Sequence, residues 1–550
     1  MTRPHVLILG GGGVFGSRLA RLLARRHAFR ISLGGRQEGR VAALQRELRM
    51  IDEQGEFAFV HVDRDRIGVE RLREIGCNLV VDCSGPFQLS GTHLVEAAIG
   101  ARCHYMDLAD ARKFVTGIGK FDGAARAVAV SVISGASTTP ALTHAVLDAL
   151  TAGWQSVDSV DVAIVPGNKT PKGRAVVEAI LSWVGARVRV FREAGWEVRS
   201  GWADPRSVAI EGLRRRRVFV ADVPDLDLLP ARYAPRVRAG FDAGMELPVL
   251  NWLIGLAGLA VRWGIVKSAR AFVGPGTMIA RWLEPLGSDA GGMLVEAAGV
   301  DARGEARVAR WWLRAERGDG PYVPVIPAAA LASALLLEHR GRSGARTAAG
   351  LLTLEQVKPW FDGLAIETGQ AAFRGEKPLF RRAMGEAFDA LPEVTRRLHR
   401  GRPAIVAEGE ALVAPAENGL ARMVAGWFGV PREEGRVPVR VVIESRDGRE
   451  HWTRFFADKP MRSVMKLGKP GFIEEQFGAV SMQMQLVARH GGLDMVRVGG
   501  RLWGVPLPHF LLPSIKAEER YDEGGRHRFD VEIGLPVLGR LVAYRGYLVI

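Results

Sequence analysis

The sequence predicts an α/β fold: a doubly wound parallel sheet, followed by an α+β domain and a C-terminal, mainly antiparallel β domain. Three observations predict it. Short apolar runs alternate with helical patterns over residues 1–150, the patterns are mixed over 151–390, and alternating runs between turns dominate 391–550. A chain of 550 residues also exceeds what a single hydrophobic core organises, which is about 250–300 residues.

Within the first 150 residues, apolar runs predict strands separated by helices. The predicted strands are 5–10, 29–33, 57–62, 78–83, 102–106 and 128–133. The predicted helices are 14–26, 39–51, 69–75, 92–99 and 110–118. This alternation is typical of βαβ units, in which the strands are parallel and helices cover both faces of the sheet.

The middle of the chain predicts an α+β domain. Residues 156–165 and 308–315 alternate like strands, whereas 174–184 and 328–338 have helical spacing. An apolar stretch at 247–266 is long enough to cross a bilayer, which takes about 20 residues. Because an arginine and several glycines interrupt it, three alternatives stay open: a buried or dimer-interface helix, a helix on a membrane surface, and a membrane span.

The segment 390–402 is charged and turn-rich, and we place the last domain boundary there. Beyond it, alternating runs end at glycine-rich turns that let neighbouring strands fold back, so we expect an antiparallel sheet or open barrel. Large apolar side chains predict that this sheet encloses a pocket for a lipid-like ligand. They are Phe455, Phe456, Phe472, Phe477, Met482, Met484, Trp503 and Phe510.

Composition indicates a globular protein of a reducing compartment, with 47% hydrophobic and 25% charged residues. Cys77, Cys83 and Cys103 have neither disulfide-framework nor metal-ligand spacing, so we expect buried thiols and no metal. The first apolar run leads into a glycine motif rather than to a cleavage site. We therefore expect a cytoplasmic protein, with peripheral membrane association as the alternative.

The formal net charge is +15, but the basic residues are scattered. The densest run is Arg214–Arg217, and no zinc-finger, RNP or basic-zipper pattern accompanies it. We therefore expect a small-molecule substrate and no nucleic acid as partner. Attraction to an anionic membrane surface stays open.

A glycine motif joins the first predicted strand to the first predicted helix. Its residues, which match G-x-G-x-x-G, are Gly11, Gly12, Gly13, Val14, Phe15 and Gly16. In this context Gly11 permits a tight turn, Gly13 lets the backbone approach a pyrophosphate, and Gly16 lets helix and strand pack closely. Free N–H groups at the start of the helix bind the phosphates. The motif predicts a Rossmann domain that binds a dinucleotide.

The ends of the next strands predict which dinucleotide is bound. The second strand ends without an acid for a ribose 2′-hydroxyl, and Arg36 follows, whose guanidinium suits a 2′-phosphate. We therefore expect NADP(H). Asp63 follows the third strand and is expected at the adenine edge, or else as a simple turn residue. The loop after the fourth strand is expected to pass the cofactor on its nicotinamide side; it consists of Ser84, Gly85 and Pro86.

A series of motifs resembles the saccharopine dehydrogenase-like family of NADP-binding oxidoreductases. The motifs are 11–16, 81–87 (VDCSGPF), 104–108 (HYMDL), 134–140 (SGASTTP), 286–292 (LGSDAGG) and 320–324 (GPYVP). The resemblance extends over residues 4–370 and implies a Rossmann domain joined to an α+β domain for substrate contacts and dimerisation. It implies hydride transfer between NADP(H) and a carbon bonded to nitrogen or oxygen. Residues 400–550 are similar to an uncharacterised bacterial domain.

Candidate catalytic residues lie near the predicted ligand side of the sheet. Tyr105 could donate a proton, with Asp107 orienting it, because both end the fifth strand. The alternative is that Tyr105 packs in the core and Asp107 caps the next helix. His93 opens a helix and could act as acid or base near neutral pH, or face solvent.

These observations favour an NADP(H)-dependent oxidoreductase that acts on a small or lipid-like metabolite. The alternative is a sensor or membrane-associated scaffold that binds NADP(H) without turnover. The glycine motif is common to both hypotheses. Polar groups beyond the strand ends favour the enzyme, whereas the apolar stretch at 247–266 favours the scaffold. A homodimer is compatible with either.

Overall fold

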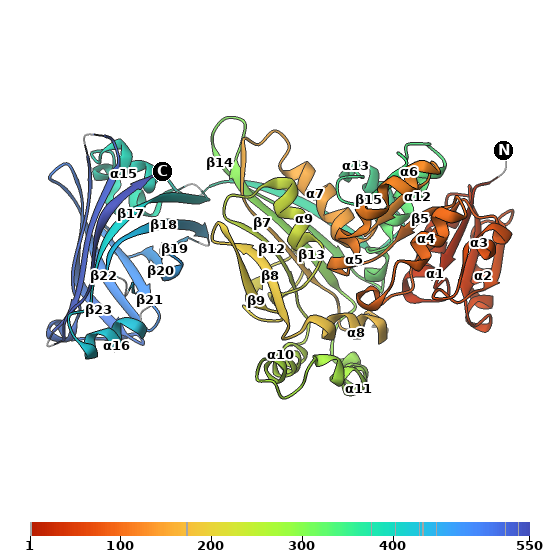
Figure 1. The fold of residues 1–550 in the computed structure, drawn as a ribbon, viewed down its shortest axis with the longest axis horizontal. Helices are drawn as coiled ribbons and strands as arrows, with labels where there is room; N and C mark the ends of the chain where they lie inside the picture. Colours follow the sequence, from red (N-terminus) through yellow and green to blue (C-terminus); the bar gives the residue numbers. More distant parts are fainter. Residues whose placement is uncertain are drawn as a thin grey trace.

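The computed structural model describes residues 3–171, 174–375, 377–401, 403–427, 430–431, 434–446, 448–522, 524–536 and 538–550. Three β-sheets follow one another along the long axis of the molecule (Figure 1). We call the parts around them the N-terminal, central and C-terminal units. The predicted α/β fold class is confirmed for the chain as a whole.

The N-terminal unit is a seven-stranded parallel sheet with the strand order β15-β6-β5-β4-β1-β2-β3. Its strands are β1 His5–Leu9, β2 Arg30–Gly35, β3 Phe57–His61, β4 Leu79–Asp82, β5 His104–Asp107, β6 Ser131–Ser134 and β15 Gly344–Thr347. Strands β5 and β6 begin later than predicted. Arg102 and Ala129 have positive φ, so they belong to the turns that precede these strands.

Helices cover both faces of this sheet, as predicted. They are α1 Val14–Ala24, α2 Gly39–Ile51, α3 Val69–Ile75, α4 His93–Gly100, α5 Arg112–Thr116 and α6 Asp122–Ala127. Helix α1 buries Leu19, Leu22 and Leu23 against one face of the sheet. Helix α4 packs on the other face, where Leu94, Val95 and Ala98 are buried.

The central unit is built on a nine-stranded mixed sheet. Its strands are β7 Ser156–Val165, β8 Arg187–Arg192, β9 Gly195–Ser200, β10 Arg206–Val208, β11 Arg216–Val220, β12 Arg238–Ala243, β13 Gly291–Val300, β14 Ala306–Ala315 and β16 Ile366–Arg374. Strand β7 pairs in parallel with β12 and antiparallel with β13. The predicted strands 156–165 and 308–315 are therefore confirmed.

Within the described residues, seven α-helices lie between residues 143 and 357, around the central sheet and between it and the N-terminal unit. They are α7 Thr143–Leu150, α8 Arg174–Trp183, α9 Asp225–Tyr233, α10 Pro248–Arg262, α11 Val273–Leu283, α12 Ile326–Leu336 and α13 Leu354–Val357. Helix α12 is buried along nearly its whole length and packs against α1. The chain therefore returns to the N-terminal unit, adds β15 to that sheet, and leaves again through β16.

The apolar stretch at 247–266 contains helix α10, which ends at Arg262, and then a turn at Gly264 with positive φ. Among the described helices, none is long and apolar enough to cross a membrane. Of the three alternatives, the membrane span is thus not supported by the length of this helix. Helix α10 lies beside α11 at one side of the central unit (Figure 1).

The C-terminal unit is an eleven-stranded antiparallel sheet that closes on itself where β22 pairs with β23. Its strands are β17 Ala404–Pro415, β18 Gly435–Arg446, β19 Arg449–Phe456, β20 Lys459–Leu467, β21 Phe472–Phe477, β22 Val480–Arg489, β23 Gly492–Leu502, β24 Val505–Pro506, β25 Ser514–Tyr521, β26 His527–Leu535 and β27 Gly539–Val549. Its helices are α14 Leu379–Met384, α15 Glu393–Leu398 and α16 Gly419–Trp427. The sheet is therefore closed rather than open.

The turn-rich segment 390–402 is packed onto this sheet rather than exposed as a linker; residue 402 lies outside the described residues. Thr395 and Leu398 of α15 are buried, and the His399 ring nitrogen Nε2 lies 2.8 Å from the Glu519 carboxylate of β25. The hydrophobic cluster of the C-terminal unit also includes Leu379. Its core thus begins several residues before the sequence pattern changes.

Candidate functional site

A cleft of about 1180 Å³ lies at the carboxyl edge of the N-terminal sheet. Residues that follow β1, β2, β3, β4 and β5 line it, and α8 and β12 of the central unit form its opposite wall. Ligands of open parallel sheets bind at this edge. The cleft is therefore the candidate cofactor and substrate site.

The glycine motif forms the floor of the cleft at the start of α1. The sequence analysis assigned the tight turn to Gly11. In the structure Gly10 has φ +72°, so Gly10 is the residue that adopts the left-handed conformation at this turn. A Cβ on Gly16 would lie 2.3 Å from the Gly10 carbonyl oxygen, which confirms the close approach of helix and strand predicted for this residue. Gly12, Gly13, Val14 and Phe15 line the cleft, whereas Gly11 packs under Leu33.

The start of α1 fits a phosphate group. Gly13 occupies the N-cap position, no side chain caps the helix, and its first turn contains no acidic residue. The first N–H groups of an uncapped helix are donors for an anion, and the helix dipole adds a partial positive charge. The pyrophosphate of a dinucleotide matches this chemistry.

Two arginines stand at the mouth of the cleft beside the end of β2. Arg36 and Arg40 are exposed cavity-lining residues, and neither makes an ion pair with another described residue. Arg40 was missed from the sequence because it lies in the first turn of α2 rather than directly after a strand. Asp63 also lines the cleft, and its carboxylate accepts a hydrogen bond from the Asp65 backbone N–H (3.1 Å). Asp63 thus both shapes a turn and faces the cleft.

The loop Ser84–Pro86 lines the cleft, and Asp82 at the end of β4 fixes its start. The Ser84 backbone N–H and hydroxyl both donate to Asp82 Oδ1, at 2.9 and 2.5 Å. Arg64 Nε donates to the other carboxylate oxygen at 2.7 Å. Arg64, which also lines the cleft, was not predicted, although it directly follows Asp63.

Three polar side chains that the sequence analysis missed lie farther along the cleft: Asp110, Ser137 and Thr139. Burial raises the pKa of Asp110, although a hydrogen bond from Gln88 Nε2 (3.0 Å) works in the opposite direction. The buried Thr139 hydroxyl has no hydrogen-bond partner within the described part of the chain. An unpartnered hydroxyl on a cavity wall is free to bond a ligand.

The remaining wall is apolar. From α8 it includes Val176, Ala179, Ile180 and Trp183, and from β12 it includes Phe241. No sequence signal could have placed these residues at the site, because they come from the central unit. The cleft thus combines a polar edge for a cofactor with a wall suited to an apolar substrate.

The three candidate catalytic residues do not line this cleft. Tyr105 is fully buried in the core of the N-terminal unit, and burial together with the nearby Asp107 charge raises its pKa. Asp107 is also fully buried; its carboxylate accepts hydrogen bonds from Ala109 N, Ser134 Oγ and Gly135 N. Burial raises its pKa to about 6. His93 is exposed at the start of α4. The structure therefore does not bring these residues together at the site.

Comparison with known families identifies two parts of the chain. Residues 6–151 match the saccharopine dehydrogenase NADP binding domain. Residues 391–548 match a domain of unknown function, DUF4166. The resemblance inferred from the motifs is therefore confirmed for the saccharopine dehydrogenase-like NADP-binding domain, and the glycine motif, Arg36 and the loop after β4 all lie inside the matched region.

Solved structures resemble parts of the chain at low similarity. A Thermotoga maritima protein described as a probable dehydrogenase is 9% identical, with 67% of this chain and 98% of that chain covered and a TM-score of 0.33. Pen from Bacillus thuringiensis is 14% identical, with 24% and 51% covered and a TM-score of 0.21. This chain thus spans about half the length of Pen. Among curated proteins, nothing matches the sequence.

Two other hollows lie in the C-terminal unit. The interior cavity measures about 80 Å³, far below the roughly 300–1,000 Å³ of a ligand pocket. Phe456, Phe477, Met482 and Met484 line it, but Trp503 and Phe510 are exposed. Within the described part of the chain, the predicted lipid-sized pocket inside this sheet is therefore not present, because side chains of β18–β27 occupy most of the interior.

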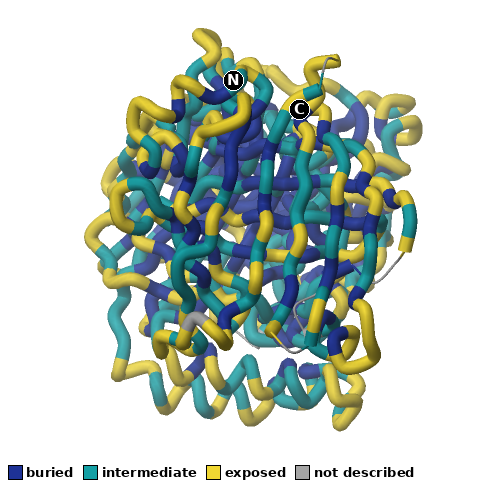
Figure 2. The backbone as a smooth tube through the Cα atoms, turned by 90° about the vertical axis from the view of Figure 1, so that its left-hand side faces the viewer, coloured by how far each residue is buried: buried dark blue, intermediate teal, exposed yellow. Residues whose placement is uncertain are grey.

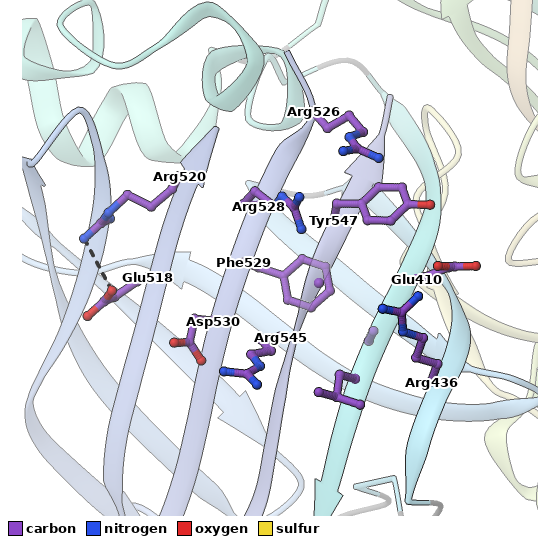
Figure 3. Close-up of a pocket in the computed structure, with 13 residues that line it drawn as sticks. Glu410, Arg436, Glu518, Arg520, Arg526, Arg528, Phe529, Asp530, Arg545 and Tyr547 are labelled. Carbon is purple, nitrogen blue, oxygen red and sulfur yellow. Dashed lines mark ion pairs between the residues drawn. The ribbon is translucent and has the colours of Figure 1, made fainter. Parts of the chain in front are cut away.

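The second hollow is an open groove of about 670 Å³ on the outside of the same sheet. Figure 3 shows Arg526 and Arg528 beside Tyr547, and Arg520 farther across the sheet, paired to Glu518. Arg526 and Arg528 both pair with Asp522. Acidic neighbours already neutralise much of the charge of this groove. In the cleft of the N-terminal unit, by contrast, Arg36 and Arg40 make no ion pair with another described residue.

Proposed function

We propose that this protein is an NADP(H)-dependent oxidoreductase that transfers a hydride to or from a carbon bonded to oxygen or nitrogen in an apolar metabolite. The supporting observation is that one continuous cleft carries an uncapped helix start, unpaired arginines at its mouth and the half-buried carboxyl of Asp110 beside an apolar wall. The match to an NADP-binding domain supports the cofactor class.

The residues of the cleft divide between the parts of such a cofactor. The N–H groups at the start of α1 would hold the pyrophosphate, and Arg36 and Arg40 would bind the 2′-phosphate. Thr139 would donate its free hydroxyl to the nicotinamide end. When bound, the reduced cofactor supplies the hydride.

Asp110 is the proton donor in this proposal. Reduction of a carbonyl or imine adds a hydride to carbon and requires a proton on the oxygen or nitrogen. Because burial raises the pKa of Asp110, its acid form persists to higher pH than that of an exposed aspartate. The oxidation direction uses the same group as a base. The apolar wall of α8 and β12 excludes water from this step.

The test combines binding and turnover. Trp183 lines the cleft, so NADPH binding should quench tryptophan emission by energy transfer, and Trp183→Phe should reduce that signal. NADPH oxidation is then followed over a panel of medium- and long-chain aldehydes, ketones and imines, and NADP⁺ reduction over the corresponding alcohols and amines. Binding with turnover of an apolar member supports the proposal. Binding without turnover in either direction favours the sensor or scaffold, and no binding overturns both.

A further inference from the structure

Helices α10 and α11 and the turns around them form a helical tip, residues 248–286, at one side of the central unit. It projects at the lower edge of Figure 1, and the lowest segment of Figure 2 carries many exposed positions. Its tryptophans are strongly exposed: Trp252 by 63%, Trp263 by 73% and Trp282 by 73%. The other exposed large apolar residues of the tip are Val249, Leu256, Ile265, Met278 and Leu286.

Such an apolar surface is costly in water. Burial of large apolar side chains is favourable, and contiguous exposed patches mark surfaces that contact a partner or a membrane. Along α10, only Leu250, Asn251 and Gly258 are buried. The exposed side of α10 is therefore apolar, although it does not pack in the core of this chain.

The charge of the tip selects the kind of partner. It carries four basic residues, Arg262, Lys267, Arg270 and Arg281, and one acidic residue, Glu284. None of the basic residues makes an ion pair with another described residue, and Arg262 and Arg281 directly precede exposed tryptophans. Indole rings beside unpaired cations match the interface of an anionic bilayer, where tryptophan lies at the headgroups and basic side chains are attracted to the anionic lipids.

An apolar cavity of about 320 Å³ lies directly behind the tip. The residues that line it come from α8, α10 and the region of α11, together with Met245 before α10, and none of them is charged or polar. Leu256 belongs both to the cavity wall and to the exposed surface. Val176 and Ile180 of α8 line this cavity and the cofactor cleft alike, so a single helix separates the two.

We propose that the helical tip docks on an anionic lipid bilayer, and that the cavity behind it takes the hydrocarbon chain of a lipid substrate whose reactive carbon enters the cofactor cleft. The second part rests on the proposed function. The first part does not, because the exposed tryptophans and unpaired cations belong to the tip alone.

Vesicle flotation tests the docking. The full-length protein should float with phosphatidylcholine vesicles that contain phosphatidylglycerol, and much less with phosphatidylcholine alone. High salt should release it, because screening shortens the range of the charges. The triple variant Trp252→Ala, Trp263→Ala, Trp282→Ala should bind at least about 100-fold more weakly, since it loses most of the inserted apolar surface. Trp503→Ala removes an exposed tryptophan from the C-terminal unit and is the matched control.

Other results would overturn the docking. If the triple variant floats like the wild type, the tip is not the membrane contact. If the wild type is a dimer by light scattering without vesicles and the triple variant a monomer, the tip is an interface between two copies of the chain. Unchanged NADPH binding by the triple variant shows that it is folded.

Binding of the fluorescent fatty acid cis-parinaric acid tests the cavity. A Cβ on Gly276 would face Leu181 and Val177 at 3.7 and 3.9 Å, so Gly276→Leu should fill the cavity. We expect this variant to bind the probe at least about tenfold more weakly, while it still floats with anionic vesicles. Equal binding by variant and wild type, or no binding by the wild type, overturns the lipid route. Vesicle and probe binding without any NADPH turnover supports docking and refutes the redox function.

Discussion

Glu193 of the β8–β9 turn and Arg462 of β20 join the central and C-terminal units through a bidentate ion pair. Arg462 Nε lies 2.7 Å from Glu193 Oε1, and Nη2 lies 2.7 Å from Oε2. Thr453 Oγ1 donates to the same carboxylate at 3.0 Å. Glu193 and Ala194 both have positive φ, so this tight hairpin turn adopts a conformation that side chains disfavour. The contact with the C-terminal unit stabilises it.

We predict measurable coupling between these two residues. Burial of Glu193 opposes its ionisation, but the bonds from Arg462 and Thr453 outweigh it and hold the pKa below the ordinary value. A double-mutant cycle of Glu193→Gln and Arg462→Ala on the free energy of unfolding should give about 0.5–1 kcal/mol at neutral pH, because Arg462 is partly exposed.

The pH dependence of this coupling has a defined sign. A carboxyl whose pKa is depressed in the folded state stabilises it above the unfolded pKa of about 4.3 and loses that contribution as the pH falls through the folded value. The cycle should therefore give the same coupling at pH 7 and pH 5.5 and none in strong acid. Coupling that grows on acidification would contradict the assignment.

Arg36 should decide cofactor choice. A hydrogen bond to a charged group contributes about 1.5–3 kcal/mol, so Arg36→Ala should weaken NADPH binding roughly 10- to 150-fold and leave NADH nearly unchanged. Gly35→Asp should shift preference toward NADH, and a Cβ at Gly35 meets no atom within 4 Å. Titration of both cofactors checks this, with Arg49→Ala on the exposed side of α2 as control. Equal weakening of both cofactors by Arg36→Ala would refute it.

Asp110→Asn should lower turnover without weakening NADPH binding. Loss of general acid catalysis costs about 10²- to 10⁴-fold. In the wild type, carbonyl reduction should slow as the pH rises through the raised pKa of Asp110, and the variant should lose this limb of the profile. Tyr105→Phe is the comparison: because Tyr105 is in the core away from the cleft, it should leave the profile intact. If Tyr105→Phe removed this limb of the profile and Asp110→Asn did not, Tyr105 would be the catalytic acid instead.

Gly16→Ala should destabilise the N-terminal unit and abolish tight NADPH binding. Its Cβ would lie 2.3 Å from the Gly10 carbonyl oxygen, and overpacking of this kind costs about 1–3 kcal/mol. Gly123→Ala, in a helix where a Cβ meets nothing within 4 Å, should be neutral or slightly stabilising. Melting temperature with and without NADPH measures both effects. A fully functional Gly16→Ala protein would show that the close contact is dispensable.

The sequence predicted the parts of the fold that depend on local patterns. The strands and helices of the N-terminal unit follow from apolar runs and the glycine motif, and Arg36 follows from its place after β2. Tyr105 and Asp107 carried the same signal, since both end β5, but their side chains turn into the core. Three residues later, Asp110 reaches the cleft instead. Hydrophobic periodicity predicts where a strand ends at the edge of the sheet. It does not predict which side chain near that end lines the cleft.

Features that depend on distant contacts were not predictable. Val176, Ile180 and Trp183 reach the cleft only because the central unit folds back over the N-terminal sheet. The closure of the C-terminal sheet depends on the pairing of β22 with β23, which alternation does not specify. Strand β15 was missed because Gly344–Thr347 contains no apolar run, and its place is set by pairing with β6 and by the Asp122 carboxylate, which accepts from Ala345 N at 3.0 Å.

The late position of β15 has a consequence for how the protein is made. Strand β6 ends at Ser134, but its neighbour β15 begins only at Gly344. During synthesis the ribosome therefore releases the first six strands of the N-terminal sheet with the β6 edge unpaired, and that edge stays open to wrong partners until Gly344–Thr347 has emerged. We expect pausing of translation between these two points to prolong this exposure and to lower the yield of native protein.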